Sequence, residues 1–174
     1  FRIDGEGQEI AADKTTIGEC LRRAGYETFG VGKWHNGRAA FARAFSGGDK
    51  IFFGGMADHW NVPVYRFDPA GQYASRCPFI ADPWRSNRKD FRECDHIVAG
   101  RHSTELLVEA AIRLLGRRDR RRPFFLHLAL LAPHDPRSAP DDFLRLYDPR
   151  AIPLPENFLA AHPIDTGALG CRDE

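Results

Sequence analysis

The amino-acid sequence predicts an α/β fold in which a mostly parallel sheet is flanked by helices. Two stretches of the chain follow the same order, which is an amphipathic helix, an apolar strand and a polar loop. The second strand is a nearly continuous apolar run, PFFLHLALL, as is typical of a strand buried on both faces of a parallel sheet. This alternation of helices and strands is the basis of the α/β prediction.

The composition is that of one ordinary globular domain. The chain has 174 residues, of which 43% are hydrophobic and 28% are charged. Its formal net charge is +1, so no overall field favours nucleic acid or an anionic membrane as a partner. No stretch approaches the roughly 18 apolar residues of a membrane span. The start, FRIDGEGQEI, does not resemble a signal peptide. The four cysteines form no C-x-x-C pair, so they predict neither a zinc ribbon nor a small disulfide framework. They do not indicate whether the protein is in a reducing or an oxidising compartment.

The first helix is expected over about residues 16–24. Thr16 and Glu19 have the spacing of a capping box, and a glycine that can end the helix follows. The segment 26–31, YETFGV, then predicts a short strand, because aromatic and β-branched residues suit a pleated surface. A loop bounded by glycines is expected at residues 32–37.

The second unit repeats this order. Leucines and alanines recur at helical spacing over residues 103–115, which predicts an amphipathic helix. The apolar run over residues 123–131 predicts a strand, and the polar loop 132–136, APHDP, follows it. Residues 140–147 predict a short helix, with a proline near its first turn.

The remaining segments carry weaker signals. Residues 47–83 are rich in Gly, Pro, Asp and aromatic residues, so we expect irregular turns or a small hairpin that forms a pocket wall. The arginine-rich segment 117–122 is interpreted as a solvated turn at a helix C-terminus, because no aromatic residues are interleaved to stack bases. The Pro-rich tail from residue 152 is expected to be extended, and the sheet to be incomplete at both ends.

Both polar loops leave the carboxyl ends of their strands, where ligands bind in open α/β sheets. The first loop carries Lys33 and His35, and the second carries His134. A lysine supplies a point charge and imidazoles supply directed hydrogen bonds. We therefore predict that Lys33, His35 and His134 converge on a site for a small tetrahedral oxyanion.

The segment Asp58-His59-Trp60 has two open interpretations. These residues line a substrate pocket, with Trp60 stacked on a sugar or an aromatic group, or they serve packing alone. We keep Asp58, His59 and Trp60 as substrate-binding candidates, together with Lys33 and His134.

Other polar residues are assigned structural roles. Trp34 is interpreted as a packing residue that holds its loop, and His127, inside the apolar run, as a core histidine. His96 and His102 are expected at the surface or as caps. The acidic pair at 141–142 precedes a helix and favours its positive N-terminus.

Two long segments carry a family resemblance. The segment 21–35, LRRAGYETFGVGKWH, resembles the second sulfatase signature, in which a helix ends in G-Y, a strand follows and G-K-W-H closes the pattern. The segment 123–136 resembles the later sulfatase strand that ends in A-P-H-x-P. The segments 54–63 and 147–158 are similar to blocks of one bacterial sulfatase subgroup. Together these segments cover most of the chain, and G-K-W-H is the most specific of them.

The resemblance implies that residues 1–174 are the central portion of a sulfatase catalytic domain, a partial alkaline-phosphatase-like sandwich without a second domain. Lys33 would bind sulfate and steady the nucleophile. His35 would hydrogen-bond the hydrated nucleophile and help to break down the sulfated intermediate. His134 would bind sulfate and protonate the leaving alcohol. The substrate would be a small-molecule or glycan sulfate ester. The compartment would be periplasmic or extracellular if a missing N-terminus carries a signal peptide.

Two elements of the family pattern are missing from the sequence. In the family that the chain resembles, the nucleophile is a formylglycine made from the cysteine, occasionally a serine, of C-x-P-S-R or a close variant, and it acts beside a divalent metal, usually Ca²⁺. None of the four cysteines begins that pattern, and no early Asp-Asp pair or late D-N-G or D-H-G motif occurs. The nucleophile and the metal ligands are therefore expected outside this chain. Attack at sulfur needs both, so the isolated chain is expected to be inactive.

Two alternatives remain open. One is a phosphodiesterase or phosphonate hydrolase of the same alkaline phosphatase superfamily, because a lysine–histidine pair tolerates either oxyanion. The other is a non-catalytic relative that binds sulfate without hydrolysis.

Overall fold

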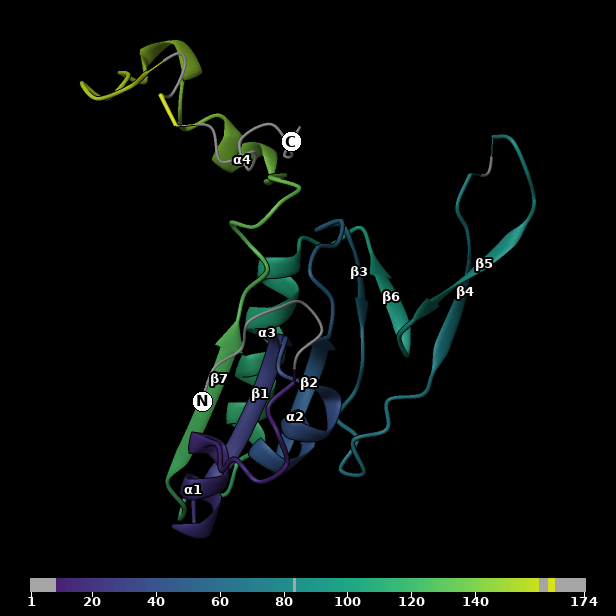
Figure 1. The fold of residues 1–174 in the computed structure, drawn as a ribbon, viewed down its shortest axis with the longest axis vertical. Helices are drawn as coiled ribbons and strands as arrows, with labels where there is room; N and C mark the ends of the chain where they lie inside the picture. Colours follow the sequence, from purple (N-terminus) through teal and green to yellow (C-terminus); the bar gives the residue numbers. More distant parts are fainter. Residues whose placement is uncertain (1–8, 83, 160–162, 165–174) are drawn as a thin grey trace.

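A parallel three-stranded sheet forms the centre of the computed structural model, which describes residues 9–82, 84–159 and 163–164. Its strand order is β2 (Gly47–Phe52), β1 (Glu27–Lys33) and β7 (Phe124–Ala129), and both neighbouring pairs run parallel (Figure 1). The prediction of a mostly parallel sheet is confirmed.

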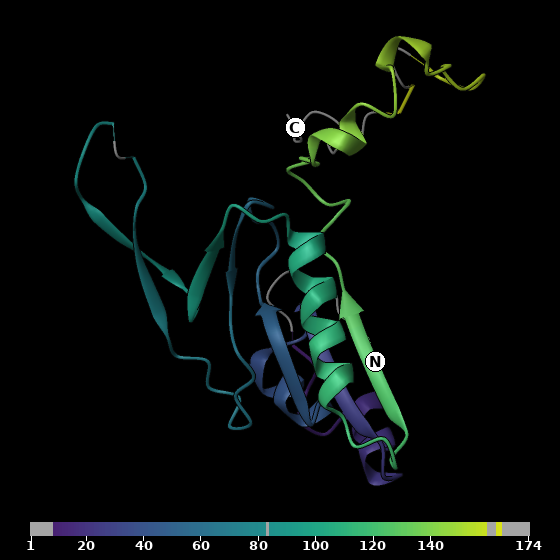
Figure 2. The same cartoon turned by 180° about the vertical axis from the view of Figure 1, so that it is seen from behind.

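Helices cover both faces of this sheet. The long helix α3 (Ser103–Arg117) packs along one face, and α1 (Ile17–Arg23) and α2 (Arg38–Ala44) lie on the opposite side (Figure 2). The first helix begins with the predicted capping box, because the Thr16 hydroxyl accepts from the backbone N–H of Glu19 and the Glu19 carboxylate accepts from that of Thr16. Both predicted helix–strand units are therefore present.

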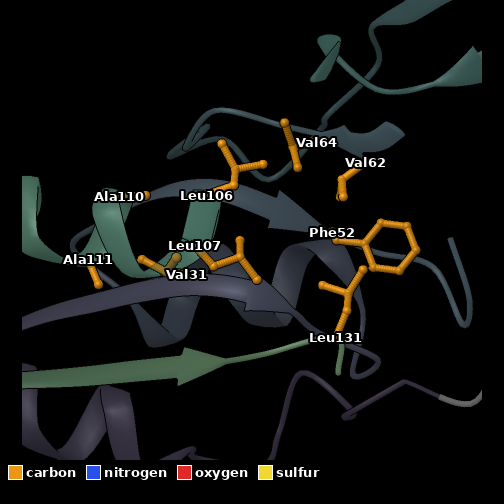
Figure 3. Packing of buried hydrophobic residues seen from close by; sticks show 9 residues of the cluster. All are labelled: Val31, Phe52, Val62, Val64, Leu106, Leu107, Ala110, Ala111 and Leu131. Atoms are coloured by element: carbon orange, nitrogen blue, oxygen red, sulfur yellow. The ribbon is translucent and has the colours of Figure 1, made fainter. Parts of the chain in front are cut away.

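Two apolar clusters hold the helices to the sheet. The cluster under α3 is shown in Figure 3 and consists of Val31, Phe52, Val62, Val64, Leu106, Leu107, Ala110, Ala111 and Leu131. The cluster under α2 is aromatic and consists of Phe41, Ala44, Phe45, Ile51, Tyr65, Tyr73 and Cys94. Burial of these side chains fixes both loops at the carboxyl ends of the strands relative to the sheet.

The expectation of irregular turns over residues 47–83 was wrong for two strands. The segment begins with β2, which pairs with β1, and it contains β3 (Asn61–Val64), which pairs antiparallel with β6 (His96–Ala99). We read the glycines of β2 as turn residues, yet Gly48 lies so close to the Gly30 carbonyl that a Cβ would not fit without displacement. Helix α2, in the loop region after β1, was not predicted either.

The small hairpin expected in the same region does exist: its first strand lies within residues 47–83 and its second strand follows them. It consists of β4 (Arg76–Ile80) and β5 (Lys89–Glu93), which pair antiparallel and project from the body of the molecule (Figure 1).

The prediction that the apolar strand is buried on both faces was also wrong. Strand β7 lies at the edge of the sheet, and Phe124 and Leu128 are 41% and 36% exposed. Within the described part of the chain, β1 is its one hydrogen-bonded neighbour. An apolar run shows that a strand is suited to burial on both faces. Whether its side chains are in fact buried depends on which elements pack against the strand.

The arginine-rich turn after α3 has a structural role, as expected. Arg118 donates to the Leu115 carbonyl at the end of α3, at 2.8 Å. Arg122 donates to the Gly25 carbonyl beyond α1, at 3.0 Å. Both guanidinium groups thus satisfy carbonyls at helix C-termini.

The C-terminal segment extends away from the sheet (Figure 1). It contains the short helix α4 (Asp141–Leu144) and the 3-10 turn η1 (Pro149–Ala151). The helix is shorter than the predicted 140–147, and the two aspartates occupy its first turn, as expected. No helix in the described residues is long and apolar enough to cross a membrane.

Replacing Gly32 with alanine is expected to destabilise the protein by about 2–5 kcal/mol. Gly32 has a φ of +88°, and a Cβ at this position would collide with the Ala129 carbonyl oxygen of β7. Gly116→Ala is the control, because Gly116 lies in α3 with open space around its Cα, and alanine there should raise stability slightly. Thermal unfolding measures both, and a Gly32→Ala protein that melts with the wild type would contradict the prediction.

Candidate functional site

The two loops predicted to form the site leave the same edge of the sheet. Strands β1 and β7 are parallel neighbours, and Gly32 pairs with Ala129 at their carboxyl ends. Lys33 is the last residue of β1, and His134 lies in the loop after β7. The fold thus places both loops where ligands bind in α/β sheets.

Lys33 and His35 lie around the backbone of Gly55. The Lys33 ammonium donates to the Gly55 carbonyl oxygen at 2.6 Å. A Cβ on Gly55 would lie 3.9 Å from the His35 ring, so these two residues are close neighbours. Lys33 is half-buried, and this burial lowers its pKa. His35 is exposed, so its imidazole is accessible to a ligand.

Trp34 holds this loop in place, as predicted. Its indole N–H donates to the Gly37 carbonyl at 2.9 Å, and its ring packs edge-on against Phe41, Phe45 and His127. Side chains alternate along an extended backbone, so the partly buried Trp34 leaves its two neighbours on the other side. These contacts confirm that His127 packs among apolar rings, as predicted, although it is half-buried rather than in the core, and its burial lowers its pKa.

His134 has its backbone fixed and one ring nitrogen free. Its backbone N–H donates to the Leu131 carbonyl at 3.0 Å, and its own carbonyl lies 3.0 Å from Nε2 of His59. Its Nδ1 is buried and has no hydrogen-bond partner among the described residues. A buried, unpaired ring nitrogen is costly unless a ligand or water completes it.

A groove of about 890 Å³ lies beside His134. It runs between the first turns of α3 and the loop after β7, and Trp60, Pro133 and Phe143 supply much of its apolar wall. This groove could accommodate an apolar face of a ligand beside His134.

One loop contacts both halves of the predicted site. Gly55 accepts from Lys33, and four residues later His59 bonds to the backbone of His134. The loop 54–60 therefore connects the two groups that the sequence placed in separate segments.

The structure separates the roles of Asp58, His59 and Trp60. Asp58 accepts from the Asn61 amide at 2.6 Å and the Trp60 backbone N–H at 2.9 Å, and these bonds lower its pKa. Asp58 borders a cavity of about 380 Å³, whereas His59 and Trp60 line the groove beside His134. His59 is 1% exposed, and Trp60 is half-exposed. Substrate contact by these three residues stays a prediction.

Of the two histidines expected at the surface or as caps, His102 is a cap as predicted, whereas His96 is not a surface residue. His102 is buried and accepts from the Thr104 backbone N–H at the start of α3, which confirms the capping role. His96 is half-buried, with its Nε2 at 2.7 Å from the ammonium of Lys50. The cap at His102 is local in sequence, whereas the partner of His96 lies on another strand and leaves no local signal.

The described residues do not fit the metal or the nucleophile that the resemblance implies. No three His, Cys, Asp or Glu side chains within these residues come together as metal ligands do. Cys20 lies exposed on α1, and Cys94 is buried, which raises the pKa of its thiol to about 11. A Ca²⁺ ion and a formylglycine would have to be held by other residues.

The fold and the site define an α/β protein whose parallel sheet carries a lysine at the end of one strand and two histidines in loops at its carboxyl edge. The structure of BT4656 in complex with its substrate D-glucosamine-2-N,6-O-disulfate is similar to this chain, with a TM-score of 0.54. The two are 21% identical, over 86% of this chain and 25% of the other. This likeness confirms the predicted fold class, an alkaline-phosphatase-like sheet flanked by helices.

Residues 2–162 match the family model named Sulfatase, and the chain belongs to the sulfatase family. It is 26% identical to N-acetylglucosamine-6-O-sulfatase of Bacteroides thetaiotaomicron, over 83% of this chain and 21% of the relative. It is 29% identical to N-acetylgalactosamine-6-sulfatase of Homo sapiens, over 78% and 25%. It is 30% identical to an arylsulfatase of Klebsiella aerogenes, over 83% and 30%. The chain thus spans less than a third of the length of these relatives.

Proposed function

We propose that this chain is the central portion of the catalytic domain of a sulfuric ester hydrolase, in which it supplies part of the sulfate-binding pocket. The observation that carries the proposal is the loop 54–60, which bonds Lys33 through Gly55 and the backbone of His134 through His59. Membership of the sulfatase family supports the same reaction class.

Lys33 is proposed to bind the nonbridging oxygens of the sulfate. An ammonium group has three donors, and the bond to Gly55 uses one of them. Partial burial strengthens its attraction to an anion, because the surrounding dielectric constant is lower than in water. His35, exposed beside the same glycine, is proposed to hydrogen-bond the hydrated nucleophile.

His134 is proposed to bind sulfate and to protonate the leaving alcohol. Its free Nδ1 can hold a proton that no other described group shares. Proton donation to a departing alkoxide lowers the barrier most for poor leaving groups. A formylglycine hydrate and a divalent metal, Ca²⁺ in the proposal, would supply the nucleophile and neutralise charge on sulfate.

The proposed substrate is a small-molecule or glycan sulfate ester. Two curated relatives are named as 6-sulfatases of N-acetylated amino sugars, and a third as an arylsulfatase. Trp60 at the groove beside His134 is suited to stack on the apolar face of a sugar or an aryl ring. Asp58 borders the second cavity, with Arg38 and Arg92, and could accept from sugar hydroxyls there.

Matched esters test this proposal on the complete protein that carries this chain. We expect turnover of 4-nitrophenyl sulfate to exceed that of 4-nitrophenyl phosphate, bis(4-nitrophenyl) phosphate and a phosphonate monoester. Equal or faster turnover of a phosphorus ester would favour the phosphodiesterase or phosphonate hydrolase alternative. Binding of inorganic sulfate without any hydrolysis would favour a non-catalytic relative.

A further inference from the structure

His59 and His102 form a buried stacked pair beside the loop that carries His134. Their ring centroids are 5.2 Å apart and the ring planes differ by 7°. The two residues are 1% and 7% exposed. His59 comes from the loop before β3, and His102 is the N-cap of α3, so the pair joins two elements.

The hydrogen bonds of the pair indicate a defined tautomer for each ring. A carbonyl oxygen can only accept, so Nε2–H of His59 donates to His134 at 3.0 Å and Nε2–H of His102 donates to Ser138 at 3.1 Å. Nδ1 of His102 accepts from the Thr104 N–H at 3.3 Å, so this ring is neutral. A proton on Nδ1 of His102 would point at the Thr104 N–H, which is also a donor.

Ser103 holds the His59 side of the pair. Its hydroxyl lies 2.6 Å from Nδ1 of His59, and its backbone N–H donates to the His59 carbonyl at 2.8 Å. Ser103 is completely buried. With its proton on Nε2, the neutral His59 ring has only a lone pair on Nδ1, so the Ser103 hydroxyl donates to that nitrogen.

We propose that His59 and His102 are positioning residues that together clamp the loop 134–138 and thereby aim the His134 ring at the sulfate ester. The two Nε2–H groups donate to carbonyls at both ends of this loop. With its N–H bonded to Leu131 and its carbonyl bonded to His59, the His134 backbone cannot rotate freely. Its ring direction then depends on the side-chain rotamer alone. This role rests on the proposed function, in which His134 is the proton donor.

Conservative variants of the complete protein separate positioning from folding. His59→Gln keeps a donor near the Nε2 position, whereas His59→Asn keeps an acceptor toward Ser103 and is too short to reach the His134 carbonyl. His102→Asn keeps a good N-cap for α3 but loses the bond to Ser138. The asparagine variants should therefore fold, and each should lose one of the hydrogen bonds that hold the loop 134–138.

We expect each asparagine variant to lower kcat for an alkyl sulfate by about 10²-fold, since misplacement by about 1 Å has this effect, with KM almost unchanged. The loss should be smaller for 4-nitrophenyl sulfate, whose leaving group needs less protonation. His59→Gln should retain most of the wild-type kcat. Equal losses in the glutamine and asparagine variants, or unchanged kcat in His59→Asn, would overturn the proposal.

NMR of the imidazole nitrogens tests the clamp independently of activity. Both rings are expected as the neutral Nε2–H tautomer in the wild-type protein at neutral pH, with the His59 signals shifted in Ser103→Ala. A Nδ1–H tautomer or a cationic ring at His102 would overturn the clamp even in an active sulfatase. Conversely, the expected tautomers in a protein without sulfatase activity would support the clamp and refute the proposed function.

Discussion

Replacing Lys33 with methionine is expected to lower kcat/KM for sulfate ester hydrolysis by about 10²- to 10³-fold, the loss typical of removing one donor to a developing anion. Methionine nearly matches the length of lysine, so the loop around Gly55 keeps its packing while the charge disappears. Lys14→Met is the matched control, because Lys14 is exposed and pairs with its neighbour Asp13. Steady-state kinetics of both variants measure the effect.

The alkaline limb of the pH profile is a second test of the proposed role of Lys33. Burial lowers the pKa of this lysine from its ordinary value of 10.5. The ammonium is present below that lowered pKa and binds sulfate there. Binding should therefore weaken as pH rises through a value below 10.5. A Lys33→Met protein as active as Lys14→Met, or with the same alkaline limb as the wild type, would contradict the assignment.

Replacing His134 with glutamine is expected to lower kcat for an alkyl sulfate by about 10²- to 10⁴-fold, the usual contribution of general acid catalysis. Glutamine keeps an amide donor but cannot deliver a proton. The loss should be much smaller for 4-nitrophenyl sulfate, since a phenolate departs without full protonation. The ratio of the two losses is the decisive quantity, because a purely structural defect would slow both substrates alike.

His96→Gln is the matched control for this variant. His96 contacts Lys50 on β2, outside the groove that His134 lines, so its replacement should leave both substrates almost unaffected. Equal losses on the alkyl and aryl esters in His134→Gln would rule out proton donation and leave sulfate binding as the role of His134.

Local signals predicted the elements that carry the site. The capping box at Thr16 and Glu19 marks the start of the first helix within one residue, because the cap depends on neighbours in sequence. Both strands lie where the apolar pattern predicted them, except that β1 continues to Lys33, so the first loop begins at Trp34 rather than at Gly32. Parallel pairing then places Lys33 and His134 at one edge of the sheet.

Other features have no local signal. Strand β2 begins Gly-Gly-Asp-Lys, a sequence typical of turns, and it is a strand because its glycines allow close approach to β1. The burial of His102 and its stacking on His59 bring together positions 43 residues apart (102 − 59), which no periodicity connects. Likewise, the absence of a hydrogen-bond partner for Nδ1 of His134 among the described residues is set by the groups that surround it in space, not by its neighbours in sequence.

The sequence by itself therefore determined the α/β class, the two helix–strand units, the family and the identity of the candidate site residues. Each of these depends on spacing along the chain or on a short motif. Only the tertiary structure decided which face of each loop is buried, that the loop 54–60 bonds to both Lys33 and His134, and that two histidines clamp the latter. The physical reason is that hydrogen bonds and ring contacts form between atoms close in space, and folding alone brings distant residues within that range.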